Sequence, residues 1–365
     1  MQSGAPETGS AESGAESGNC GLGSAGARAL PLAGTPALPV RGQPPPTRRR
    51  SLLDAGLAYL LLAPSALVLG AFGLAPLIQA FLLSLRQWRL APGPFVGFAN
   101  YQQALTAEPE FWKAVVVTFY YVVGTVPVTI VLAYLLAETL HARLRGMGFY
   151  RTLFFLPYIA SPVAAAAVWR WILNPNSGIA SAVVKPLGWE PRWLYERTGL
   201  FQLLAGIFHH RLPEWAEGPS LALGCIMAVA VWQGVGFAVV VLLAGLAAIP
   251  GDVTEAARLD GARGWKLLRH VKLPLLSPTL FFLWIVFTIR AFQSFTQVYV
   301  MSVDNKGGPA GTTQNITLYI FQSFYANAPR LGPGYGAAVA MLLFLVILAL
   351  TLFQFRVLGR KVHYS

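Results

Sequence analysis

The sequence predicts an all-α membrane protein with six transmembrane helices, and three observations support that fold class. The 365-residue chain is 55% hydrophobic and only 12% charged, which is typical of a membrane protein rather than a soluble domain. Six apolar segments each approach or exceed the roughly 20 residues that a helix needs to cross a bilayer. The basic residues lie mainly at the ends of these segments, where they set the orientation in the membrane.

A polar tail precedes the six predicted helices. Residues 1–50 are rich in Gly, Ala, Ser and Pro, so we expect a disordered cytoplasmic tail, followed by a transmembrane domain over 51–365. The helices are expected over residues 55–85, 114–137, 149–172, 221–249, 279–301 and 337–355. Prolines inside them, such as Pro127, Pro157 and Pro162, are expected to be tolerated because neighbouring helices satisfy the freed backbone groups.

The distribution of Lys and Arg predicts the orientation. With the N-terminus inside, the cytoplasmic parts hold sixteen of these residues and the outer loops nine, which is the bias of the positive-inside rule. Both termini and the loop at 250–278 then face the cytoplasm. This bias explains the net charge of +12 without a nucleic-acid partner. Cys20 and Cys225 indicate neither a disulfide framework nor a metal site.

The most distinctive stretch is in that cytoplasmic loop and has the sequence DVTEAARLDGARGWKLLRHVKLPLLSP. Asp252 and Glu255 have the spacing of a capping box, so we expect a short helix that begins at Asp252. Gly261 should end it, because glycine adopts the left-handed backbone without steric cost. A second helix should follow and end at Leu273 and Pro274, since proline removes a backbone donor.

This loop resembles the EAA loop of the membrane subunits of bacterial ATP-binding-cassette (ABC) importers. The family pattern is EAA, three residues, G, nine residues and then I-x-LP. The matching positions here, with valine in place of isoleucine, are Glu255, Ala256, Ala257, Gly261, Val271, Leu273 and Pro274. The resemblance implies a coupling helix that lies in a cleft of an ATPase subunit. The alternative is an amphipathic helix that only covers the membrane surface.

Further segments resemble the maltose/glycerol-3-phosphate type of carbohydrate permease. They are FVGFANYQQALTAEPEFWKA at 95–114, RTLFFLPYIASPVAAAAVWRWILNPNSG at 151–178 and GGP at 307–309. The resemblance covers nearly the whole chain after the tail and implies the type I importer permease fold. Ala180 stands where this group often has asparagine, and residues 196–219 look like an insertion in an outer loop. The pair His209 and His210 in it lacks a third ligand at usable spacing, so no metal site is expected.

The predicted fifth helix carries candidates for a solute path. Arg290, Gln293, Ser294 and Gln297 follow i, i+3, i+4, i+7 spacing and would share one face of a continuous helix. An arginine in the middle of a span costs about 2.5–3.5 kcal/mol, so Arg290 should face protein or water, where it would bind an anionic or polyhydroxyl ligand. The alternative role of this face is contact between paired permease subunits. In the maltose-type permeases that the chain resembles, this helix carries sugar contacts.

The predicted fourth helix adds Trp232 and Gln233 as candidates for the same path. Trp232 would stack on a sugar ring, and its alternative role is to pack against a neighbouring helix. Tyr120, Tyr121 and Tyr158 either line the path or pack between helices. Glu138, near the inner end of the second predicted helix, is expected to lie at the membrane interface.

No phosphate-binding G-x-x-x-x-G-K-[ST] loop and no paired-carboxylate, nucleophile or metal constellation is present in the sequence. We therefore expect neither an enzyme nor a cofactor held by this chain. The resemblance implies that ATP is used by a pair of partner ATPase subunits, alongside a second permease and an extracytoplasmic binding protein, at a bacterial inner membrane. The expected function is ATP-driven import of a carbohydrate, either a sugar or sn-glycerol 3-phosphate. The alternative is an ion-gradient-driven carrier of a small polar solute, although the predicted spans lack the clear carboxylate that such carriers use.

Overall fold

The computed structural model describes residues 48–88, 91, 93–141, 146–207, 213, 217–303, 307–328, 330–357 and 359. The chain divides into two compact units, Met1–Pro64 and Ser65–Ser365, and the packing described below lies within the second. Most of the predicted tail, residues 1–47, lies outside the described residues, as do His209 and His210 of the predicted insertion.

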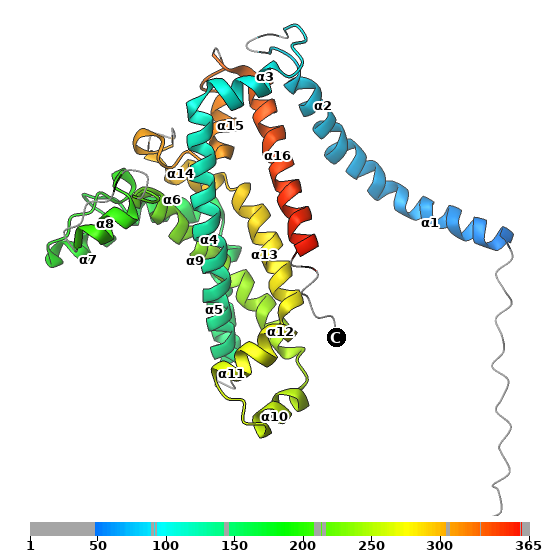
Figure 1. The fold of residues 1–365 in the computed structure, drawn as a ribbon, viewed down its shortest axis with the longest axis vertical. Helices are drawn as coiled ribbons and strands as arrows, with labels where there is room; N and C mark the ends of the chain where they lie inside the picture. The colour runs from blue at the N-terminus through cyan, green and yellow to red at the C-terminus, as the bar shows by residue number, and fades with distance from the viewer. Residues whose placement is uncertain are drawn as a thin grey trace, which may run out of the picture. The chain divides into compact units, whose positions relative to one another are not determined.

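Helices and loops make up the described residues, in which the only β-structure is two isolated bridges (Figure 1). The α-helices are α1 (Arg48–Leu69), α2 (Ala75–Ser84), α3 (Ala99–Gln102), α4 (Pro109–His141), α5 (Met147–Ile159), α6 (Pro162–Ile172), α7 (Ile179–Val184), α8 (Leu200–Ile207), α9 (Leu221–Ala247), α10 (Gly251–Leu259), α11 (Trp265–Leu267), α12 (Leu273–Leu275), α13 (Ser277–Phe292), α14 (Thr296–Met301), α15 (Ile316–Phe324) and α16 (Gly332–Val357). Three π-helical turns interrupt them, at Gly70–Leu74, Gln103–Ala107 and Leu268–Lys272.

Within the described ranges, four helices are long and apolar enough to cross a membrane, and the number rises to six if each of two bent pairs is one span. The predicted segments 114–137, 221–249 and 337–355 fall on the continuous helices α4, α9 and α16. The predicted helices over 149–172 and 279–301 are each interrupted. The upper count is six, but the second bent pair joins Trp265–Leu275 to Ser277–Phe292, so it covers the predicted fifth segment only over residues 279–292 and includes part of the predicted cytoplasmic loop.

The prediction of one helix over 149–172 is wrong, because α5 and α6 meet at an angle of 93°. Ser161 has extended backbone (φ −54°, ψ 126°), and Pro162 is the first residue of α6. Proline disfavours helical backbone at the residue before it and is well suited to the first helical position. Pro162 therefore starts a new helix instead of being accommodated inside one.

The core of the second unit is built around α4 and α9, with α5 and α13 packed against them (Figure 1). α9 is buried along its length, and Ile226, Val239 and Leu242 on it are fully buried. Gly236 permits a close approach of α5, because a Cβ at this position would lie 2.3 Å from the Phe154 carbonyl oxygen. These tightly packed helices hold the middle of the bundle, where the candidate site lies.

The two ends of this unit carry different elements (Figure 1). α10, α11 and α12 lie at the end where α9 finishes and α13 begins, while α3 and α15 lie at the opposite end. At that opposite end α15 packs against α16, and Arg330 forms an ion pair of 2.8 Å with the buried carboxylate of Glu108.

Candidate functional site

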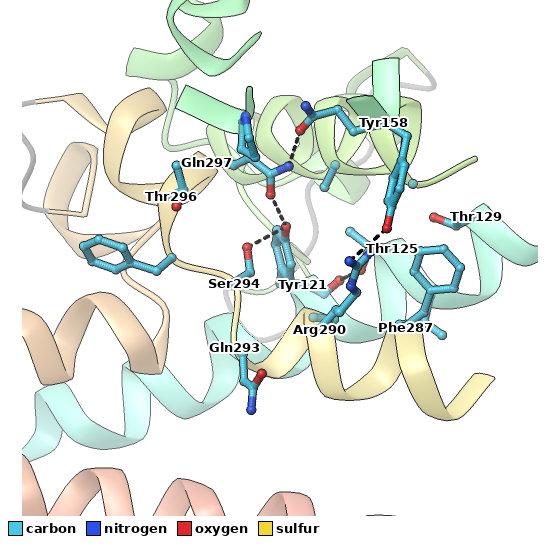
Figure 2. Close-up of a pocket in the computed structure, with 17 residues that line it drawn as sticks. Tyr121, Thr125, Thr129, Tyr158, Phe287, Arg290, Gln293, Ser294, Thr296 and Gln297 are labelled. Carbon is cyan, nitrogen blue, oxygen red and sulfur yellow. Dashed lines mark hydrogen bonds between the residues drawn. The ribbon is translucent and has the colours of Figure 1, made fainter. Parts of the chain in front are cut away.

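A cavity of about 470 Å³ opens between α4, α5, α9 and α13 (Figure 2). Its polar lining residues are Tyr121, Thr125, Thr129, Tyr158, Gln233, Arg290, Gln293, Ser294, Thr296 and Gln297. Apolar side chains, including Phe287 and Phe295, complete the wall. Of the described residues that line the cavity, Arg290 alone is charged at neutral pH and none is a carboxylate. The cavity therefore offers neutral hydrogen-bonding groups, aromatic rings and one positive charge.

The wall next to Arg290 is formed by an interruption of the predicted fifth helix. α13 ends at Phe292 and α14 begins at Thr296, so the prediction that four polar residues share one face of a continuous helix is wrong. The break leaves backbone carbonyls without helical partners. Asn315 Nδ2 and Thr317 Oγ1, both from the start of the α15 region, donate hydrogen bonds to the Ser294 carbonyl. Irregular backbone at this depth is acceptable because protein groups satisfy it and it lines a cavity.

A chain of hydrogen bonds runs across the cavity wall and joins α4, α5, α9 and α14. Figure 2 shows its links at Ser294, Tyr121 and Gln297. Ser294 Oγ donates to Tyr121 Oη (2.9 Å), and Tyr121 Oη donates to Gln297 Oε1 (3.4 Å). Gln297 Nε2 donates to Gln233 Oε1, whose own amide donates to the Pro157 carbonyl (3.4 Å). The network fixes the orientation of the polar groups before any ligand binds, which lowers the ordering cost of binding.

Arg290 projects into the cavity beside the ring of Tyr158 (Figure 2). Its Nη2 donates to Tyr158 Oη (3.1 Å), and its Cζ lies 5.4 Å from the centre of the Tyr158 ring and 5.7 Å from that of Phe237. Such cation–π contacts hold a guanidinium in place without neutralising it. Among the described residues no carboxylate pairs with Arg290, and a guanidinium has five N–H donors, so most of its donors remain available to a ligand.

The structure brings most of the predicted path residues together. Arg290, Gln293, Ser294 and Gln297 of the fifth segment all line the cavity, and so does Gln233 of α9. Trp232 does not belong to the lining; it is 41% exposed, and its ring packs edge-on against Trp169 at 5.5 Å.

Thr125 and Thr129 are lining residues that the sequence did not single out. With Tyr121 they recur every four residues on α4, and this periodicity of polar groups in an apolar span was the available signal.

The loop that precedes α13 begins with α10, and this helix begins earlier than the sequence predicts. The N-cap is Pro250, with no side-chain cap, and Asp252 lies inside the first turn, so the predicted capping box is wrong. The predicted stop is confirmed: Gly261 has φ +81°. The Gly261 amide bonds the Arg258 carbonyl (3.1 Å) and the Ala262 amide bonds the Ala257 carbonyl (2.9 Å), which is a complete Schellman motif.

The second half of the loop also departs from the prediction, because the chain remains helical past Leu273 and Pro274. α11 passes into the π-helical turn Leu268–Lys272, where the Leu273 amide bonds the Leu268 carbonyl, and α12 then extends to Leu275. Pro274 lies in the first turn of α12, where a residue without a backbone N–H is tolerated. The chain bends by 71° only at the junction with α13.

The residues of the predicted coupling motif lie on this loop with different exposures. Glu255 and Ala256 are exposed, Ala257 is half-buried, and Leu259 at the end of α10 is 90% exposed. Leu273 and Pro274 are half-buried near the start of α13. The first half of the motif is thus available to another protein, and the second half is part of the chain's own packing.

A helical bundle with interrupted spans, a polar cavity and an exposed loop helix at one end is the architecture of a transport permease. The sequence matches the family model described as "Binding-protein-dependent transport system inner membrane component" over residues 104–364, and the chain belongs to this family. It is therefore a multi-pass component of an inner membrane, and the predicted all-α membrane fold and the predicted family are confirmed. The family is one of transport permeases, not of enzymes.

Curated relatives extend this match over most of the chain. The chain is 33% identical to the sn-glycerol-3-phosphate transport system permease protein UgpA of Agrobacterium fabrum, over 85% of this chain and 97% of that protein. It is 31% identical to the trehalose/maltose transport system permease protein MalF of Thermococcus litoralis, over 85% and 96%. In fold it is similar to a chain of a bacterial ABC transporter involved in the import of the acidic polysaccharide alginate, with a TM-score of 0.67, 20% identity, and coverage of 86% and 98%.

Proposed function

We propose that this chain is the membrane-spanning subunit of an ATP-driven importer that moves a carbohydrate delivered by an extracytoplasmic binding protein. The observation that carries the proposal is the cavity, in which amides, hydroxyls, aromatic rings and Arg290 converge between helices that cross the membrane. Amide and hydroxyl groups bind sugar hydroxyls, and aromatic rings offer apolar contact. The volume of about 470 Å³ falls in the range of small-ligand sites. The names of the relatives, which include permeases for trehalose/maltose and for sn-glycerol 3-phosphate, support the same substrate class.

Energy is supplied by partner subunits in this proposal. α10 presents Glu255 and Leu259 to another protein, as a helix that docks on an ATPase subunit would. The chain itself holds no cofactor and catalyses no reaction. The proposed assembly contains this permease, a second related permease, two ATPase subunits and the binding protein. Closure of the ATPase pair on ATP moves α10, the cavity opens outward to the binding protein, and hydrolysis returns it to the inward-open state.

The uptake test separates this proposal from an ion-gradient-driven carrier. The chain is reconstituted into liposomes with its ATPase, partner permease and binding protein, and uptake of sn-glycerol 3-phosphate and maltose is measured. We expect uptake only with ATP on the ATPase side and with the binding protein on the other. Uptake by this chain alone, driven by a proton or sodium gradient, would establish the carrier instead. The absence of a carboxylate among the described lining residues supports the ATP-driven mechanism.

The proposed orientation places both termini and α10 in the cytoplasm, and cysteine labelling tests it. In a chain with Cys20→Ser and Cys225→Ser, the variant Asp260→Cys should react with a membrane-impermeant maleimide only after the membrane is opened. Glu190→Cys, in the loop after α7, should react in intact spheroplasts, because it lies on the outer side. Both residues are exposed, so access to the reagent depends on the membrane side. The reverse labelling pattern would contradict the orientation.

A further inference from the structure

An ion pair joins the second half of the loop to α4, although its two residues are 134 positions apart in the chain. Lys272 Nζ binds the Glu138 carboxylate, and Tyr134 Oη donates to the same carboxylate (3.2 Å). The Lys272 side chain is only 14% exposed and that of Glu138 37%. A lysine withdrawn this far from water requires a partner, and Glu138 is its ion-pair partner in the described part of the chain.

The backbone on each side explains why these two residues meet. Lys272 is the last residue of the π-helical turn, immediately before α12 leads into α13. A π-turn holds one residue more than an α-turn, which rotates the following side chains by about 100° relative to a continuous α-helix. Glu138 lies in the last turn of α4, where the helix dipole disfavours a carboxylate. The ammonium group of Lys272 supplies the favourable charge that the helix end lacks.

α4 runs from this ion pair to the cavity without interruption. It is one helix from Pro109 to His141, continuous through Pro127, and it packs along buried α9. Tyr121, which accepts a hydrogen bond from Ser294 in the cavity wall, lies 17 residues before Glu138. At 1.5 Å per residue, the stretch of α4 between Tyr121 and Glu138 is about 26 Å long.

Lys272 is therefore connected to the cavity by two routes. One is covalent, through α12 and α13 to Arg290; the other passes through Glu138 and α4 to Tyr121. If the loop moved α13 alone, the wall formed by Tyr121 and Ser294 would be sheared between a moving and a stationary helix. The ion pair joins the loop ends of α13 and α4, which also pack directly against each other.

We propose that the Lys272–Glu138 ion pair is a positioning contact that couples movement of the loop to α4, and through α4 to the cavity. This inference rests on the proposed function, because it assumes that α10 receives its movement from an ATPase. It goes further in assigning a transmission role to two residues outside both the cavity and the exposed part of the loop. Neither residue touches the solute, and neither needs to touch the ATPase.

The test measures solute moved per ATP hydrolysed in the complete complex, reconstituted in liposomes, with sn-glycerol 3-phosphate and maltose as probes. Glu138→Gln and Lys272→Met should each lower this ratio by about fivefold or more, which is the usual lower range of coupling between sites. ATPase subunits should still co-purify, because α10 is unchanged. The exchange of both charges, Glu138→Lys with Lys272→Glu, should restore most of the ratio, and Lys272→Arg should retain it.

Glu108→Gln is the matched control, since it removes the other ion pair of the described residues, at the opposite end of the unit. It should leave the ratio unchanged. If Glu138→Gln and Lys272→Met keep the wild-type ratio of solute moved to ATP hydrolysed, the inference is wrong but the proposed function stands. This holds even if fewer complexes assemble, provided that each assembled complex keeps that ratio. That case would assign the pair a purely structural role. Uptake of either probe by the wild-type chain without ATP and without the ATPase subunits would overturn the proposed function, and the inference with it.

Discussion

Replacement of Arg290 by glutamine is expected to lower uptake of sn-glycerol 3-phosphate by about 10- to 150-fold, while uptake of a neutral sugar changes far less. The reason is that Arg290 is the charged residue of the described cavity wall and is not paired with any described carboxylate. A hydrogen bond to a charged group contributes about 1.5–3 kcal/mol, which corresponds to that range of affinity. The measurement is uptake of sn-glycerol 3-phosphate and of maltose by the reconstituted complex, each with a binding protein that delivers it.

Two further variants separate the charge of Arg290 from its packing. Arg290→Lys keeps the charge but loses the planar fork and its stacking on Tyr158 and Phe237, so partial activity is expected. Tyr158→Phe removes the 3.1 Å hydrogen bond but keeps the ring, and only a small loss is expected. If Arg290→Gln lowers transport of the neutral and the anionic solute equally, the arginine serves to hold the aromatic wall and does not select an anion.

The cavity illustrates what the sequence predicts well and what it does not. The residue types of a polar path were visible, because Arg290 and its neighbours interrupt an otherwise apolar span. Their geometry was not, because the helix breaks after Phe292 with no proline or glycine at residues 293–295. The groups that stabilise the break, Asn315 and Thr317, lie more than 20 residues further along the chain. Local periodicity cannot detect a helix end that depends on such distant donors.

The other differences arise from backbone effects that the sequence did contain. Pro162 begins a helix because proline restricts Ser161, and the same rule was available before the structure. At α10 the N-cap is Pro250, two residues before the predicted cap Asp252, which places Asp252 in the first turn. In the first turn the positive end of the helix dipole still stabilises the Asp252 carboxylate. Asp252 therefore stabilises α10 through electrostatics and not through a cap hydrogen bond.

The end of α10 was the most predictable feature, because its cause is local. Only a left-handed residue completes the two hydrogen bonds of the Schellman motif, and Gly261 adopts φ +81° without strain. The ion pair between Lys272 and Glu138 is the opposite case. Each residue alone resembles an ordinary interfacial charge, and only the packing of the loop against α4 pairs them.

Replacement of Leu259 by aspartate is expected to release the ATPase subunits from the complex. Leu259 is 90% exposed at the end of α10, on a loop helix that this proposal places against another protein. Burial of a leucine side chain contributes about 1.5–3 kcal/mol, and an unpaired carboxylate in its place adds a desolvation cost, so binding should weaken by at least about 100-fold. Co-purification of the ATPase subunits with the tagged chain, and ATP-dependent uptake, measure the effect.

Leu187→Asp is the matched control, because Leu187 is 81% exposed in the loop after α7 and undergoes the same chemical change. It should leave ATPase co-purification at the wild-type level, since that loop faces the other side of the membrane in the proposed orientation. Glu255→Ala should give a smaller loss than Leu259→Asp, because it removes a polar contact without burying a charge. If Leu259→Asp retains the full complement of ATPase subunits, α10 does not dock on them, and the exposed leucine contacts lipid at the membrane surface instead.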